Sequence, residues 1–134
     1  MLVTLAGIAF PRYATAVARY RVSAAAYRIA QDLDLARGQS RLTSTSIMVL
    51  FSASSNSYQI VGMTDLSNRS QTYTVSMAAS QYQATLAFSG FTGSTAVTFD
   101  HMGMPNTAGV VTVTVGVYKK TLTIDGATGK VTTQ

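Results

Sequence analysis

The chain has 134 residues and a mass of 14.2 kDa, and 47% of the residues are hydrophobic, which suffices for one compact domain. It contains no Cys, which excludes a disulfide framework and a thiolate metal site and leaves the redox compartment open. Of the formal net charge of +5, the residues through Arg41 carry +4 and those from Leu42 onward carry only +1. A nearly neutral remainder argues against a large phosphate-binding surface.

The first ten residues are apolar apart from Thr4. A membrane-spanning helix needs about 20 such residues, so this run is either a fragment of a membrane helix or a short hydrophobic helix start. A secretory signal peptide is the second interpretation, because Ala16 to Ala18 offer small residues at cleavage spacing, but no positive charge precedes the run and Pro11 interrupts it. We expect a membrane or filament helix that includes Leu2, Val3, Leu5, Ile8, Phe10 and Pro11.

An apolar stripe with spacings of four, three, four and three residues follows, formed by Val22, Ala26, Ile29, Leu33 and Ala36. This spacing predicts one helix face packed on a sheet. Arg28 with Asp32, and Asp34 with Arg37, are expected to add weak ion pairs on a more polar surface. Because the upstream half lacks a polar face, we expect residues 1–21 to project and residues 22–134 to form a globular head.

The helix of the head is predicted over residues 22–41, with Gly38 and a cluster of Ser and Thr up to Ser46 ending it. The sequence then predicts short strands over residues 47–51, 58–61, 73–77, 85–88 and 96–99. Alternating Val and Thr over residues 111–115, alternation around Leu122 and Ile124, and a short strand from Val131 complete the pattern. We therefore predict an α+β fold, with a long N-terminal helix packed on antiparallel sheets.

The sequence offers no set of catalytic residues. His101 is the only histidine and is expected in a turn, and no activated nucleophile or metal-ligand spacing accompanies it. There is no nucleotide-binding glycine motif either, so we expect no enzyme activity, no cofactor, no metal and no small-molecule substrate. The loop around Met102 and Met104 is a candidate contact surface for a partner, because both side chains are expected at its tip.

Several short motifs together resemble a known family. The apolar run to Pro11 followed by Arg12 and Tyr13 resembles the N-terminal helix of type IV pilins and type II secretion pseudopilins. The segment from Ala30 to Ser46 resembles the helix end of the GspH/FimT-like minor pilins. So do C-terminal motifs in 98–100, 103, 109–115, 122–125 and 129–131. The chain departs from the family pattern in lacking a prepilin-peptidase site and any Glu. Either the true start, with that site, lies upstream of Met1, which is the interpretation we favour, or this copy is not processed in the usual way.

The resemblance implies a pilin-like fold and a subunit of a type IV pilus or type II secretion pseudopilus, without choosing between them. It implies other pilin or pseudopilin subunits as partners, and the bacterial inner membrane as the anchor, with the head in the periplasm or outside the cell. The alternative function is DNA binding for uptake, which some FimT-like pilins perform through a basic C-terminal segment. Here that segment offers only weak candidates, namely Lys130 with Lys119 and Lys120.

Overall fold

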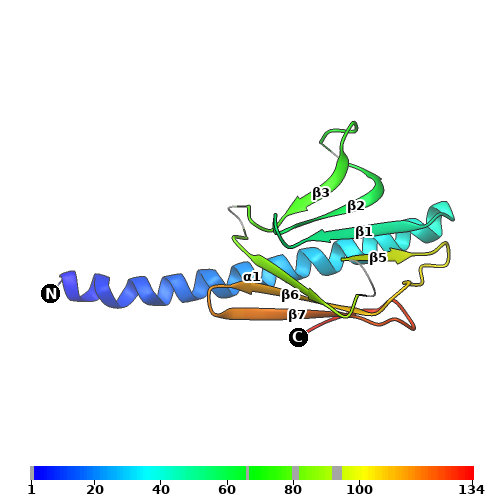
Figure 1. The fold of residues 1–134 in the computed structure, drawn as a ribbon. Coiled ribbons are helices and arrows are strands. Elements are labelled where there is room, and N and C mark those ends of the chain that lie inside the picture. The colour runs from blue at the N-terminus through cyan, green and yellow to red at the C-terminus, as the bar shows by residue number, and fades with distance from the viewer. Residues whose placement is uncertain (1, 66, 80–81, 92–94) are drawn as a thin grey trace.

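One long helix and two four-stranded sheets make up the protein, seen in a computed structural model that describes residues 2–65, 67–79, 82–91 and 95–134, with side chains from Tyr13 onward (Figure 1). Helix α1 spans Leu2–Thr43 and passes through Pro11 without a break. Its C-terminal part lies along both sheets, and its N-terminal part extends away from them. The predicted α+β class, with a long N-terminal helix packed on antiparallel sheets, is confirmed.

Eight strands follow the helix, and every strand pair is antiparallel. The first sheet has the order β3-β2-β1-β5 and the second the order β4-β6-β7-β8. The bounds are Ile47–Ser52 (β1), Ser57–Thr64 (β2), Thr72–Ser76 (β3), Thr85–Ser89 (β4), Ala96–Phe99 (β5), Gly109–Val115 (β6), Tyr118–Ile124 (β7) and Val131–Thr133 (β8).

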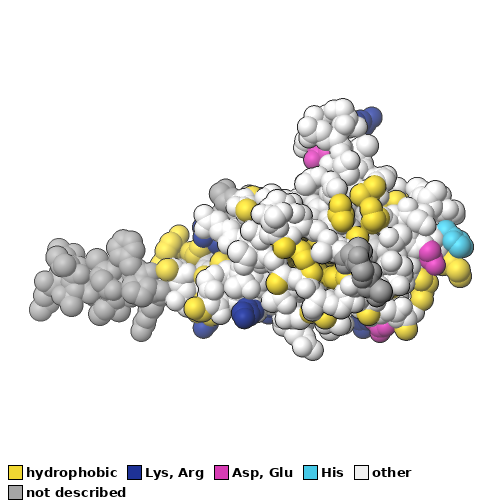
Figure 2. All heavy atoms as spheres, viewed as in Figure 1, with side chains coloured by type: hydrophobic (Ala, Val, Ile, Leu, Met, Phe, Trp, Pro, Cys, Tyr) yellow, Lys and Arg dark blue, Asp and Glu magenta, His cyan; other side chains and the backbone are white. Residues whose placement is uncertain are grey.

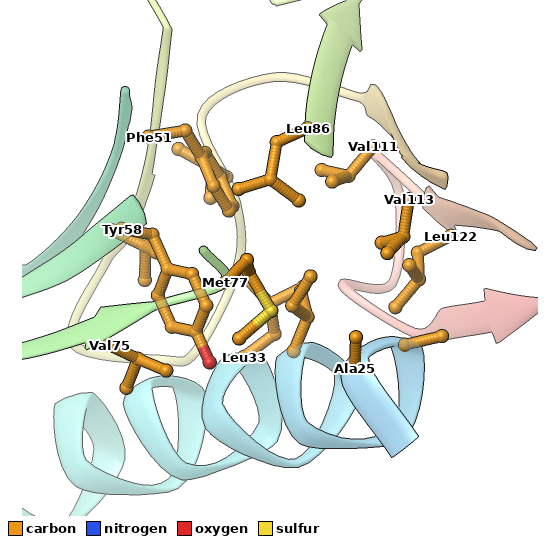
Figure 3. Close-up of a cluster of buried hydrophobic side chains, with 14 of the residues drawn as sticks. Ala25, Leu33, Phe51, Tyr58, Val75, Met77, Leu86, Val111, Val113 and Leu122 are labelled. Atoms are coloured by element: carbon orange, nitrogen blue, oxygen red, sulfur yellow. The ribbon is translucent and has the colours of Figure 1, made fainter. Parts of the chain in front are cut away.

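The hydrophobic core lies between α1 and the two sheets. In Figure 3, Phe51 of the first sheet lies next to Leu86 of the second, Tyr58 points its hydroxyl toward α1, and Leu33 reaches the cluster from the helix. The ring of Phe51 lies 5.1 Å from that of Phe88 and 5.7 Å from that of Phe91, centroid to centroid. Alternate residues of β6 are fully or nearly fully buried, as its Val/Thr alternation predicts, so the sheets and the helix share one core.

Two predicted boundaries differ from the structure. Gly38 does not end the helix. It is exposed within α1, and a side chain at this position would meet no neighbouring atom within 4 Å. Instead α1 ends at Thr43, where Ser44 takes a left-handed conformation (φ 54°) and the Thr45 N–H donates to the Ser40 carbonyl. Strand β2 also runs three residues beyond the predicted end at Val61, through a bulge that Gly62 permits with its positive φ of 100°.

Candidate functional site

The N-terminal part of α1 is the feature that the sequence singled out for membrane or filament contact. Its backbone is helical, whereas the side chains of Leu2, Val3, Leu5, Ile8, Phe10 and Pro11 lie outside the described residues. Among the described residues, no helical stretch combines the length and the apolar character needed to cross a bilayer. Of the described hydrophobic side chains packed against the core, Ala18 is the nearest to the N-terminus, close to the predicted boundary between projecting helix and head.

The predicted helix stripe faces the sheets: Val22, Ala26, Ile29, Leu33 and Ala36 are each at most 3% exposed. Ala25 is buried beside them although the sequence analysis did not include it. Ala25 lies three residues after Val22 and four before Ile29, so it falls on the same face of the helix. The contact face is therefore wider than the predicted stripe.

A buried carboxylate joins α1 to the first sheet. Asp32 is only 5% exposed, and its two carboxylate oxygens accept hydrogen bonds from the hydroxyls of Tyr58 (2.5 Å) and Tyr73 (3.1 Å). Arg28 pairs with the same carboxylate at 3.1 Å and also donates to the Tyr73 hydroxyl at 2.7 Å. The four side chains tie one turn of α1 to β2 and β3, so they fix the position of the helix along the sheet.

Sequence reasoning found only part of this network. It expected Arg28 and Asp32 to pair on polar surface, but the Asp32 end is buried, because both tyrosines reach across from the sheet to saturate it. The second expected pair, Asp34 with Arg37, is not formed among the described residues: Asp34 is exposed, and the Arg37 side chain lies close to Gly129. The signal that could have pointed to partners for Asp32 was the presence of Tyr58 and Tyr73 in two predicted strands, at positions that alternation places on the buried face.

Burial raises the pKa of Tyr58 far above its ordinary value, and the negative charge of Asp32 adds to the effect. The pKa of Tyr73 is raised as well, again mainly by burial. Because the folded pKa lies above the unfolded value of 10.0, the unfolded state loses its proton first as the pH rises. The stability linked to Tyr58 is thus fully present below about pH 10 and is lost above it.

We therefore expect the protein to lose stability above pH 10, at up to about 1.4 kcal/mol per pH unit for Tyr58. Chemical unfolding between pH 8 and 11.5, followed by circular dichroism, measures the slope. Tyr58→Phe removes the buried hydroxyl. Its free energy of unfolding is expected to be lower than that of the natural protein at neutral pH but to decrease less steeply above pH 10. Equal slopes for both proteins would contradict the role given to Tyr58.

Two arginines hold the helix where it leaves the head. The Arg19 guanidinium lies 5.2 Å from the centre of the Tyr118 ring at the start of β7, a cation–π contact. Arg21 donates to the Gln83 side chain at 2.5 Å. These contacts lie on two sides of the head-proximal end of the projecting segment, so they set the direction in which it leaves the sheets.

The loop that carries Met102 and Met104 is held by Asp100. The Asp100 carboxylate accepts from the N–H groups of Met102 and Met104, both at 2.9 Å, and these bonds to the backbone, first that of Met104, lower the pKa of Asp100. The Met102 carbonyl accepts from Arg41 at 3.1 Å. Met102 is 65% exposed and Met104 36%, so the loop presents two exposed methionines.

Asp100→Ala is expected to loosen this loop while the core stays intact. The amide hydrogens of Met102 and Met104 should exchange roughly tenfold faster, since they lose the carboxylate that accepts them. Hydrogen exchange followed by NMR measures this, with the amides of Val111 and Val113 in β6 as internal controls. Unchanged exchange at Met102 and Met104 would show that the rest of the loop fixes their position.

The three candidate DNA contacts do not come together. Lys119 and Lys120 lie in β7 opposite Thr114 and Val113, whereas Lys130 lies beside Asp125, beyond the other end of that strand. Five residues separate Lys120 from Asp125, which corresponds to about 17 Å of strand. On the face shown in Figure 2, Lys and Arg side chains are scattered and do not form a continuous patch.

The described residues contain no group of three or more His, Cys, Asp or Glu side chains that could hold a metal ion. His101 is exposed in the turn after β5. The candidate contact features are the projecting N-terminal part of α1, the Arg19 and Arg21 contacts at its base, and the loop with Met102 and Met104. They fit a subunit that is positioned by its helix.

The fold is that of pilin-like subunits, in which a long N-terminal helix packs on antiparallel strands. The family model for the type II transport protein GspH matches residues 25–129, and the chain belongs to the GspH family of minor pilins and pseudopilins. Such proteins are structural subunits, so the chain is not an enzyme. The family suggested by the sequence motifs is thereby confirmed.

Solved structures of similar fold come from two bacteria. The type IV minor pilin FimU of Pseudomonas aeruginosa matches with a TM-score of 0.65 and 15% identity, over 87% of this chain and 90% of FimU. The minor pseudopilin EpsH from the type 2 secretion system of Vibrio cholerae matches with a TM-score of 0.64 and 13% identity, over 85% of this chain and 96% of EpsH. A comparison with curated protein sequences found no significant match. At these identities the structures establish the shared fold.

Proposed function

We propose that this chain is a minor pilin or pseudopilin that assembles through its N-terminal helix into a type IV pilus or a type II secretion pseudopilus. The observation that carries the proposal is the course of α1, which continues as a helix well beyond both sheets. An apolar helix that is not covered by a sheet of the same chain needs lipid or another protein to cover it. The family membership supports the same role.

The proposal divides the chain into a projecting helix, residues 1–21, and a head, residues 22–134. The projecting helix anchors the subunit in the bacterial inner membrane and then packs against other subunits, with the head outside the cytoplasm. The apolar sequence from Leu2 to Phe10 supports this division, as do the Arg19 and Arg21 contacts that hold the helix at the edge of the head. The exposed Met102 and Met104 are proposed as a second contact with a neighbouring subunit.

Membrane fractionation of the native host tests the anchor. The full protein is expected in the inner membrane fraction, extractable with detergent and resistant to salt. Protease added to spheroplasts should digest the head, because the head lies outside the cytoplasm. A protein found wholly in the soluble fraction, or protected from protease until the cells are broken, would contradict this proposal.

DNA capture is the weaker alternative, since Lys120 lies about 17 Å along the strand from Asp125, the residue beside Lys130, and Lys119 lies further away. Each phosphate contact contributes about −0.9 to the slope of log K against log salt concentration on duplex DNA. Three cations therefore give at most weak and salt-sensitive binding. A gel-shift titration at low salt is expected to show no retarded complex. A complex that weakens in Lys119→Ala/Lys120→Ala would instead support DNA binding.

A further inference from the structure

Two arginines near the C-terminal end of α1 carry charges that no described acidic side chain neutralises. Arg37 and Arg41 are four residues apart, so they lie about 6 Å from each other along one face of the helix. Among the described residues the only ion pair joins Arg28 to Asp32. We call Arg37 and Arg41 the arginine pair.

Two loops of the head hold the arginine pair in place. A side chain at Gly103, in the loop after β5, would occupy the space taken by the Arg41 Nε and would lie 3.2 Å from the Arg37 Cγ. A Cβ at Gly129, in the loop after β7, would lie 3.2 Å from the Arg37 Nε. The Arg41 Nε donates to the Met102 carbonyl at 3.1 Å. Both guanidinium groups are therefore positioned by the backbone that passes over them.

The Arg37 guanidinium is partly withdrawn from water without a counter-charge. Its Nε is buried and has no hydrogen-bond partner among the described residues. The Nη groups form no hydrogen bond there either, but they are not buried, so they face solvent. Leaving a charged donor partly buried and unpaired costs free energy, which an anion at the Nη groups offsets. The attraction is also stronger where water is partly excluded.

The surface beside the arginine pair is apolar. Leu42 follows Arg41 in sequence and is 83% exposed, and the loop that Arg41 contacts presents the exposed Met102 and Met104. Figure 1 shows this end of α1 at the opposite end of the head from the projecting segment. Arginine and methionine are enriched in protein interfaces. A nucleic acid, with its closely spaced phosphates, would instead call for a larger set of cations.

The chain itself is a poor source of an anion for this site. It has five acidic residues, and Asp32 is buried. The carboxylates of Asp65, Asp100 and Asp125 accept hydrogen bonds from backbone N–H groups of their own loops. Among the described residues this leaves Asp34 as the exposed acid without a hydrogen bond. The net charge of +5 also opposes the approach of a second copy, so a different and more acidic protein fits better.

We propose that the arginine pair binds an Asp or Glu carboxylate of a different pilin-like subunit, whose adjacent apolar residues pack on Leu42, Met102 and Met104. This inference rests on the proposed function, and it names the chemistry by which the loop with Met102 and Met104 recognises its neighbour. A planar guanidinium forms two parallel hydrogen bonds with a carboxylate, so the site selects the orientation of the partner as well as its charge.

Carbodiimide coupling tests the proposal, because the reagent joins a lysine amine directly to a carboxylate in contact with it. Arg41→Lys is produced in the native host from the native start, and isolated filaments are treated with a water-soluble carbodiimide. Mass spectrometry is expected to find the amine introduced by Arg41→Lys joined to an Asp or Glu of another pilin-like subunit. Arg69→Lys, exposed in the loop between β2 and β3, is the matched control and should couple about tenfold less.

Removing the charges measures how much the arginine pair contributes. Arg37→Gln/Arg41→Gln keeps most of each stem, and its incorporation into filaments is expected to fall about tenfold on immunoblots. Arg37→Lys/Arg41→Lys keeps the charges and should stay within about threefold of the natural protein. Thermal unfolding of both variants shows whether the head still folds. If Arg37→Gln/Arg41→Gln unfolds early, the coupling by Arg41→Lys decides alone.

Several outcomes would overturn the proposal. Coupling of Arg41→Lys only to a second copy of this chain would mean that the site pairs copies with each other. A retarded DNA complex that Arg37→Gln/Arg41→Gln abolishes would assign the site to phosphate. If the chain is found in filaments but Arg41→Lys couples no more than Arg69→Lys, only the carboxylate proposal fails. If the chain is absent from every filament, the proposed function fails and the carboxylate proposal fails with it.

Discussion

Asp32→Ala is expected to lower the free energy of unfolding by about 1–3 kcal/mol, because it leaves the buried Tyr58 hydroxyl without its acceptor. Two tyrosine hydroxyls and the Arg28 guanidinium lose their common acceptor in a site that is 5% exposed at Asp32. Each unsatisfied buried donor costs about 1–3 kcal/mol. Chemical unfolding of the purified protein, followed by circular dichroism, measures the change.

Asp34→Ala is the matched control. It removes the same side chain two residues further along the same helix, but Asp34 is exposed and forms no ion pair among the described residues. Its effect is expected to stay within about 0.5 kcal/mol. If both variants lost the same stability, the network around Asp32 would have no special role in holding α1 on the sheet.

Phe51→Ala is expected to cost about 3–5 kcal/mol. Phe51 is 1% exposed, and its ring lies within 6 Å, centroid to centroid, of the rings of Tyr58, Phe88 and Phe91. Truncation removes the apolar area and leaves a cavity where the first sheet meets β4 of the second. The same unfolding measurement applies, and Phe51→Leu should lose less because it fills most of that space.

The exposed Val117→Ala serves as the surface control for Phe51, since Val117 is 86% exposed in the turn between β6 and β7. It should change stability by no more than about 0.5 kcal/mol. A small loss in Phe51→Ala, comparable with that of the control, would mean that the two sheets do not share one core.

Periodicity predicted the parts of the fold that burial determines. The helix stripe from Val22 to Ala36 and the alternation in β6 follow directly from which side chains face the core. The end of α1 was harder to predict, because it depends on the conformation of Ser44 rather than on Gly38. The extension of β2 past Val61 depends on a bulge, which leaves no signal in the hydrophobic pattern.

The contacts that position the helix were less predictable than the core. The pairing of Arg28 with Asp32 follows from helix spacing, but the two tyrosines that bury Asp32 come from strands 26 and 41 residues away in sequence. The separation of Lys130 from Lys119 and Lys120 depends on strand register, which the sequence does not reveal.

The most direct test of the account is complementation in the native host after deletion of the gene. The protein expressed with its native start is expected to restore pilus or pseudopilus assembly. A variant that begins at Ala18 keeps the Arg19 and Arg21 contacts, so it should fold like the head of the full protein, but it should fail to restore assembly. Restoration by the shortened variant to the level of the full chain would contradict assembly through the N-terminal helix.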